Sequence, residues 1–547
     1  PTQTRRKAVI NSIDVSKCTG CGTCFKTCGL DVFRLDTEQP VLSPCMAKCP
    51  AGTDMRAYNY LMQVGKIDEA AAKLRERNPF PAITGRVCPH QCESECSRAK
   101  VDGAVNINAI EQYLGDRTLN DPPAKPRIRH AQKVAVAGSG PAGLSCAWFL
   151  ARKGYQVKVF EALPEPGGML RYGIPAYRLP DSVVDAQVAQ LRALGVEFQC
   201  VTRVGKGCDV GFDDLAELGF KALFAAPGNG VSRRAGIAGE ELTGVFHGVE
   251  FLRDVRMGRA PRLSGRAVVI GGGDVAVDAA ITAKLLGADH VDMICLEQAE
   301  EMPAFPHNIE DAKAAGIGIH PGWGPLRVEG DGKASGIMVR RCLSVFDSNH
   351  RFAPTFDDAE TRLFEANAII FAIGQSADLA PFAERLTVER GRIAVDSVTF
   401  ETSFWNIFAA GDAVTGPSSV ISAIAGGREA AISIDRLLSG AHMHSEREEN
   451  RPVAEKLPGE GVRPAPRHER QCGALSGFAE CRVGLDDIDA LDESMRCMTC
   501  GAKARVTFRD DCMTCFFCEL RCPSEAIDVH PFKERLPYTL ETNFGGF

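Results

Sequence analysis

The chain has 547 residues, enough for several domains, and its 45% hydrophobic and 24% charged residues are typical of a globular protein. A net charge of −7 at pH 7 argues against nucleic acid or an anionic membrane as a partner. No apolar run approaches the ~20 residues of a membrane helix, and no signal core follows the basic start, so we expect a cytoplasmic protein. Twenty-two cysteines in so long a chain favour metal clusters over a disulfide scaffold, which is typical of small secreted domains.

Each end of the chain carries a cysteine motif of the bacterial ferredoxin type, C-x-x-C-x-x-C-x-x-x-C. In two-cluster ferredoxins the fourth cysteine of each motif binds the other cluster. We therefore predict that the two ends dock and hold two [4Fe–4S] clusters with crossed ligands. One predicted set is Cys18, Cys21, Cys24 and Cys522, and the other is Cys512, Cys515, Cys518 and Cys28.

The domain organisation follows from these motifs and from hydrophobic patterning. Residues 1–40 and 491–547 are predicted to be the ferredoxin-type segments. Residues 41–130 are predicted to form a mostly helical domain with an amphipathic run from Met55 to Arg77. Residues 443–490 are polar and contain several prolines, so we expect a flexible linker there.

A dinucleotide-binding loop follows the strand predicted at residues 133–137. The loop opens a helix, and an acidic residue ends the next strand, which is the full context that the G-x-G-x-x-G fingerprint requires. The glycines permit a tight turn and a close approach of the backbone to a pyrophosphate, and the acid binds ribose hydroxyls. The predicted cofactor-binding residues are Gly138, Gly140, Pro141, Ala142, Gly143 and Glu161.

A second loop and a third glycine element complete a two-nucleotide pattern. The second loop contributes Gly271, Gly273, Asp274, Val275, Ala276 and, at the end of the next strand, Glu297. The third element ends in Gly411 and Asp412; the alternative for Asp412 is a simple helix cap. We predict an α/β fold with two Rossmann-like domains. An FAD domain would span residues 131–260 and 375–442, and an NAD domain, residues 261–374, would be inserted in it.

Three further motifs carry a family resemblance. The segments 78–81, 85–90 and 167–175 resemble the small subunit of glutamate synthase and the N-terminal half of dihydropyrimidine dehydrogenase. They also resemble the large subunit of bifurcating NADH-dependent ferredoxin:NADP oxidoreductase. The resemblance covers about residues 41–440 and implies FAD on the first and third elements, a pyridine nucleotide on the inserted domain, and two iron–sulfur clusters in the helical domain. We also expect cofactor contacts from Gly168, Leu170, Arg171 and Gly374.

The resemblance implies ligands for the two clusters of the helical domain. One cluster would take Cys49, Cys88, Cys92 and Glu111, although Glu111 could instead be a surface carboxylate. The other would take Cys45, Cys96 and a C-x-x-C pair that the family places upstream and that this sequence lacks there. We predict that Cys497 and Cys500 fold back to replace that pair; the alternative is that they bind elsewhere or that this cluster is absent.

Together these patterns predict an NAD(H)-linked electron-transfer subunit with FAD and about four [4Fe–4S] clusters. The sequence shows no catalytic triad and no molybdenum or thiamine motif, so we expect a hetero-oligomer in which a partner, such as a 2-oxoacid or aldehyde oxidoreductase subunit, acts on the substrate. The alternatives are a self-contained NADH:ferredoxin oxidoreductase, with or without bifurcation, a glutamate synthase-type small subunit, and a redox sensor or scaffold. NADPH-using members of the family carry an arginine pair where this chain has Leu296 and Glu297, which predicts NAD.

Overall fold

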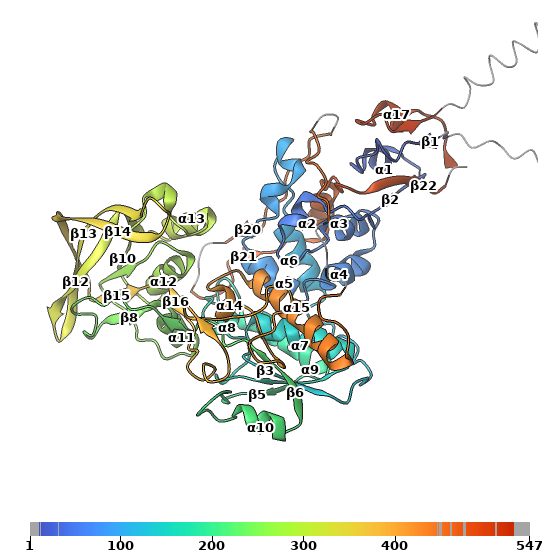
Figure 1. Ribbon diagram of the computed structural model, residues 1–547. Coiled ribbons are helices and arrows are strands. Elements are labelled where there is room, and N and C mark those ends of the chain that lie inside the picture. Colours follow the sequence, from blue (N-terminus) through green and yellow to red (C-terminus); the bar gives the residue numbers. More distant parts are fainter. Residues whose placement is uncertain are drawn as a thin grey trace, which may run out of the picture. The chain divides into compact units, whose positions relative to one another are not determined.

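The computed structural model describes residues 10, 12–30, 32–445, 447, 451–459, 462–473, 477–508 and 511–529. The chain divides into two compact units (Figure 1). Unit 1 comprises residues 1–118, 446–471 and 484–547, and unit 2 comprises residues 119–445 and 472–483. In the described part of the chain, no helix is long and apolar enough to cross a membrane.

Unit 2 contains two five-stranded sheets, with orders β19-β6-β3-β4-β5 and β11-β10-β9-β15-β8, in which all neighbouring strands are parallel. The first sheet consists of β3(Lys133–Ala137), β4(Gln156–Phe160), β5(Glu197–Gln199), β6(Phe220–Ala225) and β19(Ile407–Ala409). The second consists of β8(Val245–His247), β9(Arg266–Ile270), β10(His290–Cys295), β11(Gly318–Pro321) and β15(Ala368–Phe371). The central strands are nearly continuous apolar runs, as expected for parallel sheets covered on both faces. The predicted α/β class with two Rossmann-like domains is confirmed.

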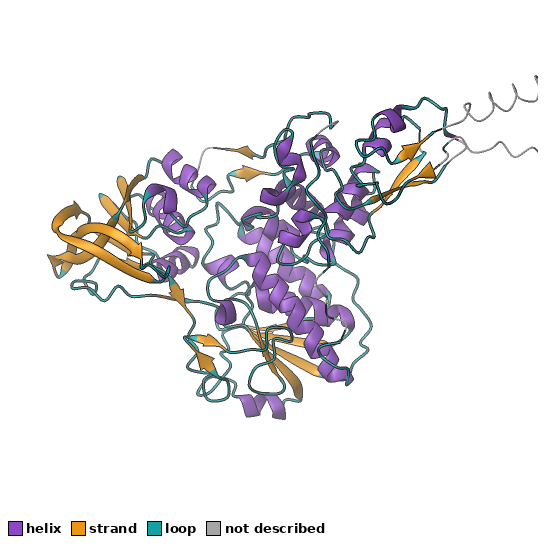
Figure 2. Ribbon diagram, turned by 45° about the horizontal axis from the view of Figure 1, so that its top comes forward, coloured by secondary structure: helices purple, strands orange, loops and turns teal. Residues whose placement is uncertain are grey.

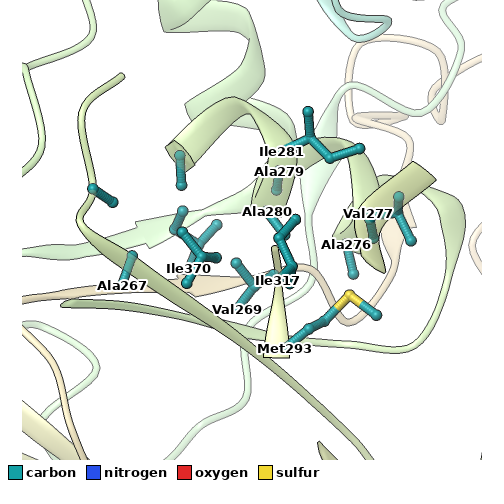
Figure 3. Packing of buried hydrophobic residues seen from close by; sticks show 14 of the residues in the cluster. Ala267, Val269, Ala276, Val277, Ala279, Ala280, Ile281, Met293, Ile317 and Ile370 are labelled. Carbon is teal, nitrogen blue, oxygen red and sulfur yellow. The ribbon is translucent and has the colours of Figure 1, made fainter. Parts of the chain in front are cut away.

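Small residues bring the helices of unit 2 close to their neighbours. The helix α7(Pro141–Lys153) follows β3 and packs against α15(Val420–Ser439). A Cβ on Gly427 of α15 would lie 2.2 Å from the Ala142 carbonyl oxygen of α7, so only glycine permits this approach. In the second domain, Ala276 and Ala280 of α12(Asp274–Leu285) lie in one buried cluster with Val269 of β9 (Figure 3).

The other elements of unit 2 surround these two sheets. The helices are α8(Met169–Tyr172), α9(Asp181–Ala193), α10(Phe212–Glu217), α11(Gly248–Arg256), η3(Ala299–Glu301), α13(Pro306–Ala314) and α14(Asp412–Thr415). The strands β12(Trp323–Asp331), β13(Lys333–Phe346) and β14(Phe352–Glu365) form an antiparallel sheet, visible as the long strands in Figure 2. Short strand pairs are β7(Val231–Ser232) with β16(Gln375–Ser376), β17(Val388–Glu389) with β18(Arg392–Ile393), and β20(Gln471–Cys472) with β21(Arg482–Val483).

The second domain begins earlier than the predicted boundary at residue 261. β8 pairs with β15 and therefore belongs to the second sheet, and α11 packs against α12 of the same domain. The chain enters this domain after β7 and leaves it at β16, and these two strands pair antiparallel. The prediction missed β8 because the glycine loop marks only the βαβ core of the domain, whereas β8 joins the edge of the sheet from upstream.

Unit 1 is built around short helices. These are α2(Pro44–Lys48), α3(Met55–Gln63), α4(Ile67–Arg75), α5(Pro81–Val87), η1(Glu93–Glu95), η2(Ser97–Lys100), α6(Ile107–Arg117) and α16(Asp487–Met495). The predicted amphipathic run forms two helices, α3 and α4, because Gly65 between them has a φ of +75°. The Asp54 side chain caps α3 by accepting a hydrogen bond from the Ala57 N–H. Tyr58, Met62 and Leu74 are buried in the core of this domain.

The two ends of the chain dock within unit 1, as predicted. β1(Ser12–Ile13) pairs antiparallel with β23(Ile527–Asp528), and β2(Phe33–Asp36) with β22(Lys503–Val506). The short helices α1(Thr23–Thr27) and α17(Phe517–Leu520) also contact each other. A Cβ on Gly20 would lie 1.8 Å from the Ala502 carbonyl oxygen, so glycine is required where the two cysteine segments meet.

The predicted flexible linker, residues 443–490, differs from expectation in its described part. Leu42 forms a β-bridge with Val453, and the Leu457 N–H donates to Ser97 Oγ at 3.1 Å. Arg467 pairs with Glu93 at 2.9 Å. A polar segment rich in proline can thus follow the surface of unit 1, because its free backbone groups and charged side chains find partners there.

Candidate nucleotide sites and cysteine sets

The first glycine loop leaves open space at the N-terminus of α7. Gly138 has a φ of +103°, and a Cβ there would lie 2.2 Å from the Ala226 carbonyl oxygen. A Cβ on Gly143 would lie 1.9 Å from the Gly138 carbonyl oxygen. At Gly140, in contrast, a Cβ would meet no protein atom within 4 Å. Helix α7 begins at Pro141, so its free N–H groups and the positive end of its dipole face a space that suits a pyrophosphate.

The carboxylate of Glu161 is fixed at the end of β4. Glu161 is only 5% exposed and accepts hydrogen bonds from the N–H groups of Ser139, at 3.0 Å, and Leu163, at 2.8 Å. The Ser139 hydroxyl also donates to it and accepts the Gly167 N–H at 2.9 Å. This network holds an acid beside the loop, where the sequence predicts that it binds ribose hydroxyls.

The segment around Gly168 lies against the first loop. Gly168 has a φ of +51°, and a Cβ there would lie 2.7 Å from the Gly140 Cα, so the two loops are in close contact. Leu170 is fully buried. The Arg171 guanidinium bonds to Asp181, at 3.2 Å, and to Asp185, so these carboxylates occupy the arginine that the sequence assigned to a cofactor.

The third glycine element meets the same loop from the other side. Gly411 has a φ of +75°, and a Cβ there would lie 3.0 Å from the Ala142 Cβ. Asp412 accepts hydrogen bonds from the Ser418 N–H at 3.2 Å and the Ser418 hydroxyl at 2.9 Å. Burial raises the pKa of Asp412. The three predicted FAD elements therefore converge on the N-terminal end of α7.

The second glycine loop has the same backbone geometry as the first, and the side chain of Glu297 lies beside it. Gly271 has a φ of +145°, and a Cβ there would lie 2.3 Å from the Ala372 carbonyl oxygen, whereas a Cβ on Gly273 would meet nothing within 4 Å. A Cβ on Gly272 would lie 2.8 Å from a carboxylate oxygen of Glu297. The Glu297 side chain thus lies against the nucleotide loop.

The remaining predicted residues of the second domain have structural partners. The Asp274 carboxylate accepts the Phe305 N–H at 3.0 Å and the Asn308 side-chain N–H at 2.8 Å. Val275 and Ala276 belong to the first turn of α12 and pack into the domain core. Gly374 has a φ of +118° and accepts the Arg233 N–H at 3.0 Å, where the chain crosses between the two domains.

In unit 1 the first cysteine set, set A, comprises Cys49, Cys88, Cys92 and Glu111. Burial, followed by the charge of Glu111, raises the pKa of each of the three thiols, so all three face this carboxylate. Glu111 is 6% exposed, and burial raises its pKa to about 8. The Tyr58 hydroxyl donates to it at 3.4 Å. The alternative of a surface carboxylate therefore does not describe Glu111.

Set B comprises Cys45, Cys96, Cys497 and Cys500, which line one cavity. Burial raises the pKa of Cys497 to about 11 and that of Cys500 to about 12, and raises the pKa of Cys45 well above its usual value. Such thiols stay neutral unless a metal displaces their protons. The structure thus brings the C-terminal C-x-x-C pair to the two cysteines that lack an upstream pair.

The cysteines of the two predicted, crossed ferredoxin-type sets lie near one another. In set C, burial and then the neighbouring thiols raise the pKa of Cys24, and these neighbours are Cys21, Cys18 and Cys522. Set D comprises Cys28, Cys512, Cys515 and Cys518, which line a second cavity. Burial is the first cause that raises the pKa of Cys518, to about 11, and its three partners in set D raise it further.

Two of the four predicted sets, B and D, each line a cavity. Among the described residues, no group of three or more His, Cys, Asp or Glu side chains could hold one metal ion. In a cubane cluster each thiolate binds a different iron, so the ligands stand apart around a volume instead of converging on a point. Sets B and D each surround such a volume.

Sequence reasoning missed the cations that accompany these sets. The guanidinium of Arg496 is 1% exposed and pairs with Glu493 at 2.6 Å and with Asp102 at 2.9 Å. Arg98 pairs with the same Asp102 at 2.6 Å. The Lys26 ammonium donates to the Cys497 carbonyl at 2.5 Å. In the sequence, the only signal for these basic residues is that they lie close to predicted cysteine ligands, because a single basic residue forms no motif.

Comparison with known proteins agrees with this geometry. The sequence model of the pyridine nucleotide-disulphide oxidoreductase family matches residues 132–427, more than half of the chain. The chain belongs to this family. A second model, "dihydropyrimidine dehydrogenase domain II, 4Fe-4S cluster", matches residues 39–122 of the chain. The predicted resemblance is therefore confirmed, and the chain is an FAD-dependent, NAD(P)-linked oxidoreductase with an iron–sulfur domain.

Two curated relatives extend the match beyond the family model. The NADP(+)-dependent formate dehydrogenase subunit beta of Moorella thermoacetica is 35% identical over 506 residues, which cover 84% of this chain and 71% of that protein. The NAD-dependent dihydropyrimidine dehydrogenase subunit PreT of Escherichia coli is 33% identical over 404 residues, covering 73% and 92%. A mutant of FprA from Mycobacterium tuberculosis shares the fold, with a TM-score of 0.50 and 20% identity over 58% of this chain and 87% of that one.

Proposed function

We propose that the chain is the electron-transfer subunit of an NAD(H)-linked, hetero-oligomeric oxidoreductase. The observation that carries the proposal is that all four predicted ligand sets lie in unit 1, where α1 of set C also contacts α17 of set D. Tyr58 donates to Glu111 of set A and lies in one core cluster with Cys92 of set A, against which Cys45 of set B packs. Lys26, between Cys24 and Cys28, donates to the carbonyl of Cys497 of set B. Both relatives are named as subunits, and the sequence has no substrate-activating motif, so the substrate reaction belongs to a partner.

The residues of the chain would position the cofactors. When bound, the nicotinamide and FAD exchange a hydride, and the clusters carry single electrons. The α7 N-terminus and Glu161 would hold the FAD pyrophosphate and ribose, and the α12 N-terminus and Glu297 would hold the NAD pyrophosphate and ribose. Sets A to D would hold four [4Fe–4S] clusters.

Anaerobic analysis of the full-length protein tests this assignment. We expect one FAD and about sixteen irons per chain, from four [4Fe–4S] clusters. NADH should bleach the flavin and then produce cluster EPR signals. A content of about eight irons per chain would contradict the assignment of clusters to two of the four sets. A flavin that NADH does not bleach would favour the alternative of a redox sensor. Mass spectrometry of the complex from the native host should identify a larger catalytic subunit; a monomer that reduces soluble ferredoxin would favour the self-contained enzyme.

The two glycine loops give a reciprocal test of which nucleotide binds where. Gly140→Ala should lower the flavin content severalfold while leaving the Tm of the apoprotein unchanged, because the added methyl meets no protein atom and enters only the space of the pyrophosphate. Gly273→Ala should retain FAD and weaken binding of the pyridine nucleotide. The readouts are the flavin-to-protein ratio and nucleotide titration. Loss of flavin from Gly273→Ala would contradict the assignment.

Glu111 should be required for set A. Glu111→Gln should remove about four irons and one EPR signal, because a neutral amide is a poor ligand for iron. Glu69→Gln, which changes an exposed glutamate of the same domain, serves as the control and should leave the iron content unchanged. A full iron content in Glu111→Gln, with all signals unaltered, would show that Glu111 is not a ligand.

A further inference from the structure

Lys26 lies where set B and set C meet. It belongs to the short helix α1, between Cys24 and Cys28 of the N-terminal motif, yet its ammonium donates to the carbonyl of Cys497, 471 positions later in the chain. On the side of set C, its side chain lies against the loop that follows Cys21, because a Cβ on Gly22 would lie 3.7 Å from Lys26 Cε. The positive charge of Lys26 therefore lies near two predicted clusters.

The charge of Lys26 has no carboxylate partner within the described residues. Two other cations of this region, Arg98 and Arg496, do have such partners, since both pair with Asp102. Their charges are largely cancelled locally. Lys503 resembles Lys26 in this respect, but it donates to the carbonyls of Val15 and Cys18, on the side of set C, whereas Lys26 donates to that of Cys497. Among the described residues the ammonium of Lys26 has no carboxylate partner, so its field acts on whatever the neighbouring sulfur ligands bind.

The contacts of Lys26 are not needed to join the two ends of the chain. Gln63 donates to the same Cys497 carbonyl at 3.3 Å, so that carbonyl keeps a donor without the lysine. Thr499 donates to the Gly20 carbonyl at 2.7 Å, and the two strand pairs close the rest of the junction. The need to hold the two ends of the chain together therefore does not explain why the partly buried ammonium of Lys26 lies beside Cys497.

We propose that Lys26 raises the reduction potentials of the clusters in sets B and C together. Adding one electron to either cluster adds one negative charge beside the ammonium, which favours the reduced state at both. The attraction falls with distance, so the clusters of sets A and D respond less. The effect would keep the reduction potentials of the neighbouring clusters in sets B and C close to each other. This inference rests on the proposed assignment of the four clusters.

Redox titrations of the full-length holoprotein, followed by EPR, test the proposal. Cys497→Ala identifies the signal of set B, and Cys18→Ala that of set C. Lys26→Met keeps the side-chain length, and Lys26→Gln keeps a hydrogen-bond donor; both should lower the potentials of these two signals and leave those of sets A and D in place. Lys26→Arg should restore the wild-type potentials. The matched control is Lys17→Met, which removes an exposed charge beside Cys18 that solvent already screens, and it should produce a much smaller shift.

The remaining outcomes distinguish this inference from the proposed function. A full iron content with unchanged potentials in both neutral variants overturns the role of Lys26 and leaves the cluster assignment intact. Equal shifts in Lys17→Met, or in all four signals, overturn it as well. Loss of iron from set B or C in both neutral variants shows a structural role instead. A wild-type protein without the iron of sets B and C overturns the proposed function itself.

Discussion

Cys522→Ala should abolish the cluster of the N-terminal motif, and Cys28→Ala should abolish that of the C-terminal motif. The reason is the proposed crossed composition of the sets, in which Cys522 lies near Cys24 and Cys28 lines one cavity with Cys518. Each variant leaves three cysteines at its site, so we expect a loss of up to about four irons and of one EPR signal, or a partial cluster with an altered signal.

Two reference variants identify these signals. Cys18→Ala removes an unshared ligand of set C, and Cys512→Ala removes one of set D. The spectrum of Cys522→Ala should match that of Cys18→Ala, and the spectrum of Cys28→Ala should match that of Cys512→Ala. The uncrossed pattern, in which Cys28→Ala matches Cys18→Ala, would contradict the shared ferredoxin arrangement.

Glu297→Arg should move nucleotide preference from NADH toward NADPH. The Glu297 carboxylate lies against Gly272 of the second loop, where it can accept hydrogen bonds from ribose hydroxyls and repel a 2′-phosphate. One unit-charge pair at roughly 4 Å, with an effective dielectric constant of about 20 to 80, costs about 1–4 kcal/mol. This corresponds to roughly fivefold to several hundredfold discrimination in kcat/KM.

Steady-state kinetics with each nucleotide and an artificial electron acceptor measure this preference. Glu297→Gln removes the charge without adding a guanidinium, so it should lose discrimination without gaining a preference for NADPH. Glu301→Arg adds an arginine at an exposed position nearby and controls for general attraction of phosphate. Wild-type protein with equal or better kcat/KM for NADPH would refute the assignment to NAD.

Local patterns predicted most of the nucleotide domains because their chemistry is local. A strand, a glycine loop and a helix are contiguous in sequence, and Gly138 and Gly271 both have the positive φ that such loops require. The docking of the two ends was also predictable, because the pairing rule for ferredoxin motifs links Cys28 to a distant motif. The resemblance, rather than periodicity, led to Glu111.

The features that were missed depend on contacts between distant residues. β8 joins the edge of the second sheet by pairing with β15, which lies more than 100 residues later in the chain. Neither segment has a sequence pattern that predicts this pairing. The described part of the predicted linker is ordered by partners such as Ser97 and Glu93, which composition cannot identify. Lys26 looks like any lysine in a polar loop until the fold places Cys497 beside it.

The pairing of β1 with β23 and of β2 with β22 also constrains how the protein is made. During synthesis, β1 and β2 can find their strand partners only after the much later strands β22 and β23 have emerged from the ribosome. Unit 2 contains two complete parallel sheets and can fold in the meantime. The cysteines of residues 18–28 therefore lack their partner strands until β22 and β23 have been synthesised. We therefore expect the proposed clusters of sets C and D to assemble late, and a chain cut short before residue 503 lacks both closing strands however well its nucleotide domains fold.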